Sequence, residues 1–206
     1  AMHIWEKIPA RERHDLLVAW LALSAAFTLA MVWGHRFDLL NIGMFFVISL
    51  ITAGIAFVVH EMAHKFTAMR YGYWAEFQMN SMMLVVAVAM AALAGIVFAA
   101  PGATVIYGNY ISREENGKIS LAGPVSNLIL IIPFAAMIFA GHAAGAGLLA
   151  VIGLVGVKIN AMIAAFNLLP VGPLDGAKIL SWNPAIFAGV ALIAFGILFA
   201  SLTGIF

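Results

Sequence analysis

The chain contains no cysteine among its 206 residues, and only 9% of its residues are charged. Without cysteine it can form no disulfide bond, and any metal ion must be held by histidine, aspartate, glutamate or weaker donors. The formal net charge is +1, and there is no basic patch with interleaved aromatic residues. The sequence therefore predicts no nucleic-acid partner.

Hydrophobic residues make up 65% of the chain, whereas soluble domains average about 45 to 50% apolar and about 25% charged residues. This composition predicts an integral membrane protein. No internal repeat or soluble appendage is visible, so residues 1–206 are predicted to form a single membrane domain of all-α, polytopic architecture. Five to six transmembrane helices are expected, because six apolar runs approach the roughly 20 residues that span a bilayer. They are 16–33, 42–59, 82–100, 119–140, 143–166 and 184–206.

A HExxH motif, residues 60–64, follows directly on the apolar run 42–59. On a helix, residues four apart share one face, so His60 and His64 can bind one metal ion while Glu61 reaches a water molecule beside it. A helix end entering the headgroup region would also accommodate these residue types. Ionisable groups at membrane depth are costly and usually functional, however, so the position favours a metal site inside the membrane.

A second polar cluster, Asn167-Leu-Leu-Pro-Val-Gly-Pro-Leu-Asp175-Gly, follows the run 143–166. Its two prolines and central glycine end the helix, and the freed backbone groups are tolerated at membrane depth only beside protein or water. Because a catalytic zinc takes three protein ligands and a water, Asp175 is a candidate third ligand. Alternatively, Asp175 begins an exposed turn. Glu76 is a competing ligand, although nothing around it resembles a built site.

These two motifs, in this order on a membrane chain, resemble the paired signatures HExxH and NxxPxxxLDG of the site-2 protease family of intramembrane zinc metalloproteases. The resemblance includes Ala122-Gly123-Pro124 and covers a core of about residues 42–178. It implies that one zinc ion is bound by His60, His64 and Asp175. It also implies that Glu61 is the catalytic acid/base and that Asn167 lies near the reacting centre. From the residues alone, Asn167 could equally be a helix C-cap.

The shared metal constrains the topology. If His60 and Asp175 bind one ion, the ends of runs 42–59 and 143–166 lie at the same membrane face, so an even number of crossings separates them. Three runs follow His60 up to that second end, and one of them therefore does not cross. Run 82–100 leads into a stretch rich in helix breakers and β-formers, so residues 77–110 are predicted to be re-entrant or interfacial, with possible β-structure. Residues 102–110 are a candidate edge strand for a substrate backbone.

The distribution of positive charge predicts the orientation of the chain. With a re-entrant segment at 77–110, eight basic residues lie on the face that carries the motifs, and Arg36 lies on the other. The eight are Lys7, Arg11, Arg13, Lys65, Arg70, Arg113, Lys118 and Lys178. By the positive-inside rule, the N-terminus and the zinc site are predicted to lie towards the cytoplasm, and the C-terminus outside.

The sequence thus predicts an intramembrane zinc endopeptidase of the cell membrane, acting in regulated intramembrane proteolysis, with one zinc per chain. Its predicted partners are a transmembrane protein substrate and the lipid bilayer, and the sequence indicates no oligomeric state. A catalytically silent zinc-binding scaffold would not need Glu61. A transporter should show matching Gly/Pro interruptions in two repeated halves, and the sequence has no such symmetry.

Overall fold

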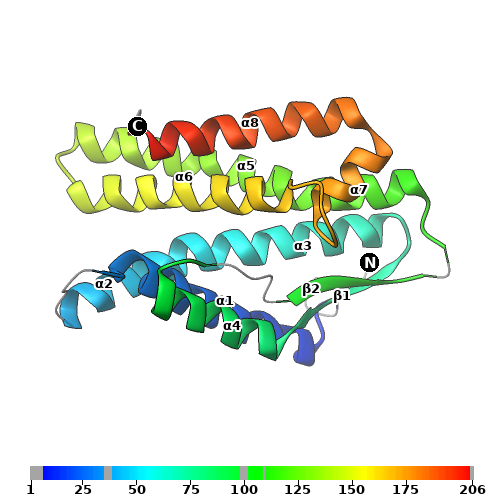
Figure 1. Ribbon diagram of the computed structural model, residues 1–206, viewed down its shortest axis with the longest axis horizontal. Helices are drawn as coiled ribbons and strands as arrows, with labels where there is room; N and C mark the ends of the chain where they lie inside the picture. Colours follow the sequence, from blue (N-terminus) through cyan, green and yellow to red (C-terminus); the bar gives the residue numbers. More distant parts are fainter. Residues whose placement is uncertain (1–6, 35–38, 98–101, 109, 205–206) are drawn as a thin grey trace.

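The computed structural model describes residues 7–34, 39–97, 102–108 and 110–204, and these are mainly helical (Figure 1). Arg36, the one basic residue predicted for the opposite face, lies outside the described residues, as do 98–101 and 109. The helices in chain order are α1 (Ala10–Val32), α2 (Leu39–Ser49), the π-helix η1 (Leu50–Gly54), α3 (Ile55–Arg70), α4 (Ser81–Ala94), α5 (Arg113–Ala143), α6 (Gly147–Asn167), α7 (Asp175–Trp182) and α8 (Pro184–Leu202). The strands are β1 (Trp74–Met79) and β2 (Gly102–Tyr107).

Five helical segments of the described residues are long and apolar enough to cross a membrane: α1, the continuous α2–η1–α3, α5, α6 and α8. The shortest, α8, has 19 residues, which at a rise of about 1.5 Å each nearly matches a hydrocarbon core about 30 Å thick. The predicted polytopic, all-α membrane fold is therefore confirmed. Within the described part of the sixth apolar run, residues 82–97, the one helix is α4.

The segment between α3 and α5 leaves strand β1 and returns to pair with it. Strands β1 and β2 pair antiparallel, with Met79 opposite Gly102 and Trp74 opposite Tyr107. The chain therefore leaves the sheet for α4 and re-enters it at a neighbouring position, which requires an even number of crossings in between. With 14 residues, α4 is about 21 Å long, too short for even one crossing. This confirms the predicted β-containing excursion, although β1 begins at Trp74 and not at residue 77.

The helix that carries the HExxH motif is interrupted by η1, which ends six residues before His60. A π-turn displaces the regular backbone bonding, and the Leu50 carbonyl accepts a hydrogen bond of 2.9 Å from Trp20 Nε1 on α1. The same indole packs on Gly54, where a Cβ atom would lie 1.8 Å from the ring. Helix α1 is thereby fixed against the start of α3.

The ends of several elements gather where the two motifs meet. Figure 1 shows the C-terminal end of α3, the N-terminal end of α5, the short helix α7 and the sheet at one end of the helices. The loop between α5 and α6 lies at the opposite end. Close packing of α5 on α6 supports this arrangement, because a Cβ atom at Gly156 would lie 2.2 Å from the Phe134 ring.

Candidate metal centre

Three predicted ligands meet in a buried triangle. His60 and His64 lie one turn apart on α3, with their Nε2 atoms 3.0 Å from each other. Oδ2 of Asp175, the first residue of α7, lies 3.3 Å from His60 Nε2 and 3.2 Å from His64 Nε2. None of the three residues is more than 8% exposed. The structure thus brings together two motifs more than 100 residues apart, and the alternative of an exposed turn at Asp175 is wrong.

The donor set and its spacing fit zinc. Ligand atoms bound tetrahedrally at about 2.0 to 2.1 Å from zinc lie about 3.3 Å from one another. The three measured separations, 3.0 to 3.3 Å, are close to that value. Two imidazoles and one carboxylate leave a fourth coordination position open, as catalytic zinc sites require. His60, His64 and Asp175 therefore form a group able to hold one zinc ion.

The carboxyl group of Asp175 is held in its ionised form. Burial acts to raise its pKa, but when the two imidazoles are protonated their charge and hydrogen bonds outweigh burial and lower the pKa below its usual range; a bound metal ion would take the place of their Nε2 protons. Its second oxygen, Oδ1, lies 3.9 Å from Lys178 Nζ one turn along α7. An ionised carboxylate is the form that binds a metal ion.

A buried amide chain orients His60. Asn127 of α5 donates from Nδ2 to the Ala56 carbonyl at 3.1 Å, which turns its Oδ1 towards His60 Nδ1 at 2.6 Å. Because an amide oxygen can only accept, the proton lies on Nδ1 and the lone pair of Nε2 is free for a metal. Asn127 also donates to Asn160 Oδ1 on α6 at 3.1 Å, and both amides are fully buried. Such partners set the tautomer and orientation of metal-binding histidines.

His64 is oriented by a backbone group of α5. Its Nδ1 lies 2.8 Å from the Ile119 carbonyl, which again places the proton on Nδ1 and leaves Nε2 free. Gly123, one turn further along α5, provides the space for both rings. A Cβ atom there would lie 2.4 Å from His64 Nε2 and 2.6 Å from His60 Nε2. The Ala122-Gly123-Pro124 sequence thus has a steric role at the site.

Glu61 faces the sheet. Its Oε2 accepts hydrogen bonds from the Thr104 backbone N–H at 3.0 Å and from Thr104 Oγ1 at 2.9 Å. Glu61 is 8% exposed and lines the same cavity as the three candidate ligands. The carboxylate between the two histidines therefore contacts strand β2 and is not part of the ligand triangle.

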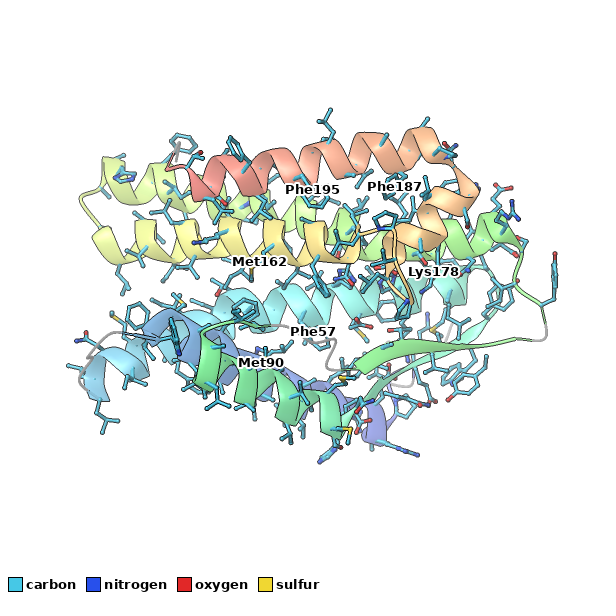
Figure 2. The ribbon with its side chains drawn as sticks, viewed as in Figure 1. Phe57, Met90, Met162, Lys178, Phe187 and Phe195 are labelled. Carbon is cyan, nitrogen blue, oxygen red and sulfur yellow. The ribbon has the colours of Figure 1, made fainter. Side chains whose placement is uncertain are left out.

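The site opens into a cavity of about 230 Å³ between α1, α3, β2, α5, α6 and α7. Most of its other lining side chains are apolar, among them Phe27, Phe57 and Met162. Figure 2 shows Phe57 and Met162 nearer the middle of the helices than Lys178, which lies at the α7 end. The cavity thus places an apolar binding surface beside the candidate metal site.

Asn167 also lines this cavity, at the last position of α6. Its Nδ2 donates to the Ile163 carbonyl at 3.0 Å, within its own helix. An amide nitrogen carries two hydrogens, so one remains for a bound molecule. Glu76, the competing ligand, lies instead on β1, where its Oε1 accepts from Trp74 Nε1 at 2.7 Å. It is not brought to the triangle.

Reasoning from the sequence did not single out Thr104, Asn127 or Asn160. The two asparagines do carry a signal, since polar residues within apolar spans are usually functional. Thr104 carries none, because only the pairing of β2 with β1 and its packing on α3 turn it towards Glu61.

Comparison with known proteins gives related sequences. The chain is 40% identical over 182 residues to "Putative zinc metalloprotease MJ0611" of Methanocaldococcus jannaschii, an alignment that covers 88% of this chain and 90% of that protein. This chain belongs to the same family of zinc metalloproteases. It is also 30% identical over 145 residues to "Putative zinc metalloprotease YwhC" of Bacillus subtilis, covering 64% of this chain and 66% of that protein. No family model and no solved structure matches the chain.

A third relative, "Zinc metalloprotease MJ0392" of Methanocaldococcus jannaschii, is 25% identical over 162 residues. That alignment covers 78% of this chain but 41% of the relative. The family membership agrees with a buried donor set that fits zinc, in a chain with five segments able to span a membrane.

Proposed function

We propose that this zinc metalloprotease is an intramembrane endopeptidase that hydrolyses peptide bonds of transmembrane proteins near the cytoplasmic side. The observation that carries the proposal is the position of Glu61. It contacts β2 and lies between His60 and His64 in sequence, within a segment long and apolar enough to span a membrane. A general base, a metal-binding group and an edge strand thus share one cavity.

The roles of the residues follow from their positions. Zinc bound by His60, His64 and Asp175 would act as a Lewis acid and lower the pKa of a water to about 7. Glu61 would take a proton from a water as its oxygen attacks the substrate carbonyl, and would return that proton to the leaving amine as the C–N bond breaks. Asn167 has one N–H left to donate to a substrate in the cavity, and one such donor in the transition state contributes about 3 kcal/mol.

Strand β2 supplies a place for the substrate backbone. The N–H of Phe77 is bound by Glu12 and the N–H of its opposite residue, Thr104, by Glu61, so this pair has no ladder bonds of its own. Antiparallel pairs alternate, so the backbone groups of Ile106 also point away from β1. Ile106 lines the cavity. An unwound substrate segment would satisfy its backbone by adding to this edge.

Two variants test the proposal. Purified chain in phosphatidylcholine vesicles is mixed with a panel of single-pass transmembrane peptides, and the products are read by mass spectrometry. Glu61→Gln should keep its zinc and lose cleavage by several orders of magnitude. Glu76→Gln is the matched control, because Glu76 lies on the same sheet but outside the cavity, and it should cleave normally.

The outcomes separate the candidate functions. Full activity of Glu61→Gln would refute the protease mechanism. Zinc binding by the wild type without cleavage of any panel peptide would favour a catalytically silent scaffold. Zinc or another solute moved across the vesicle membrane, with the peptides intact, would favour a transporter.

A further inference from the structure

Side chains of α1 and α3 occupy the outer edge of β1. The Phe77 N–H donates to Glu12 Oε1 at 2.9 Å, and the Met79 N–H donates to Asp15 Oδ2 at 3.2 Å. The Ala75 carbonyl accepts from Lys65 Nζ at 2.8 Å. An edge strand normally presents such groups to any other strand. With this edge occupied, a substrate strand would add at the outer edge of β2, next to the Thr104 N–H that Glu61 binds.

Glu12 and Lys65 form an ion pair within the protein. Lys65 Nζ lies 2.5 Å from Glu12 Oε2, with the Trp74 ring 5.2 Å from the same nitrogen. Lys65 is 0% and Glu12 2% exposed. A buried ion pair is often no more stabilising than apolar residues of similar volume. Stability alone therefore does not account for this pair, and its contacts with β1 favour a role in positioning the sheet.

The pair belongs to a closed circuit of contacts through the site. Lys65 follows Glu61 by one helical turn, so α3 holds β2 through Glu61 and β1 through Lys65. Thr104, bound by Glu61, is opposite Phe77 in the sheet. Phe77 is bound by Glu12, and Glu12 by Lys65. The circuit fits a single position of the sheet along α3.

We propose that Glu12 is a positioning residue: its bond to Phe77 fixes the register of the sheet on the catalytic helix and thereby selects which substrate bond lies beside Glu61. The inference rests on the proposed protease function. A one-residue slip in a strand reverses the direction of every side chain, so loss of register would present different substrate bonds to the site.

A matched pair of double variants isolates this role. In both, Lys65→Met removes the buried cation, so that no charge is left unpaired. Glu12→Gln then retains an oxygen acceptor for the Phe77 N–H, whereas Glu12→Leu removes it. Both proteins lose the contacts of Lys65 with Glu12 and with the Ala75 carbonyl, so a difference between them reports the acceptor for the Phe77 N–H. Neither change is made at a candidate ligand or at Glu61.

Two measurements follow on the variants in vesicles. The first is the position of cleavage in a transmembrane peptide that the wild type cuts at one bond. The Glu12→Gln double variant should still cut at that bond alone. The Glu12→Leu double variant should also cut neighbouring bonds, with kcat/KM at the original bond lowered by about 100-fold. The second is amide hydrogen exchange in the fragment of the protein that covers residues 74–79, which should be faster in the Glu12→Leu double variant alone.

Each result bears on the inference. If the Glu12→Leu double variant cuts only the original bond, whether quickly or slowly, the register role of Glu12 is overturned and the protease function stands. If that double variant or the wild type cuts no peptide, the test is hydrogen exchange. An unchanged exchange rate at residues 74–79 in the Glu12→Leu double variant overturns the register role. Absence of wild-type cleavage overturns the proposed function separately, because exchange requires no activity.

Discussion

Gly123 provides the sharpest test of the metal site, because local and tertiary effects of replacing it have opposite signs. Gly123 lies within α5, where alanine is favoured over glycine by about 1 kcal/mol. Helix propensity alone therefore predicts that Gly123→Ala stabilises the protein. The contacts of the added methyl group predict that it damages the zinc site.

The size of the damage follows from the distances. A Cβ atom at position 123 would lie 2.4 Å from His64 Nε2, whereas ordinary contact begins at 3.4 Å. The imidazoles must therefore retreat by about 1 Å, well beyond the tolerance of about 0.2 Å in zinc–ligand distances. Loss of an orienting partner alone lowers metal affinity about 10- to 100-fold. Displacing two ligands directly should cost at least as much.

Zinc affinity can be measured by competition with a chromophoric chelator in detergent, together with thermal unfolding of the zinc-free protein. Gly196→Ala is the matched control, since no side chain or other element lies within 4 Å of its Cβ position on α8. The control should bind zinc as the wild type does. Wild-type zinc affinity in Gly123→Ala would refute the packing of Gly123 on the histidines. Equal loss in both variants would show a general effect of the substitution.

Three other predictions concern the site and the topology. Asn127→Leu removes the acceptor of His60 Nδ1 and should lower zinc affinity about 10- to 100-fold in the same competition assay; unchanged affinity would contradict the orienting role. Asp175→Ala should lower zinc occupancy as measured by elemental analysis, and full retention would remove Asp175 from the site. Because the chain has no cysteine, single cysteines can replace Asn116 and His142 without background labelling. An impermeant thiol reagent should reach position 142 in intact cells and position 116 only after the membrane is opened; external labelling at 116 would contradict the cytoplasmic orientation.

The segment between α3 and α5 shows which part of the topology the sequence predicts and which part the structure establishes. The parity argument required one of three apolar runs not to cross, and the β-formers after run 82–100 indicated which one. The opposition of Met79 and Gly102 confirms this independently of any metal. The side of the membrane remains a prediction, because it rests on charge distribution alone.

The sequence by itself determined the features that depend on local chemistry. Five of its six apolar runs form helices long enough to span a membrane, because a span must satisfy its own backbone and contact lipid along its length. The spacing of His60 and His64 specifies a shared helix face, because the α-helix repeats every 3.6 residues. The prolines and glycine between Asn167 and Asp175 specify a break, because proline lacks the N–H that a helix interior needs.

Tertiary structure alone decided which residues distant in sequence contact these motifs. Asn127, Gly123 and Thr104 reach the site through the packing of α5 and β2 on α3, and no periodicity of their own segments encodes that contact. Glu12 lies 65 residues from Phe77 in sequence, and their hydrogen bond exists because α1 packs along β1. Long-range pairs depend on the shapes of several elements at once, whereas a spacing rule describes one element at a time.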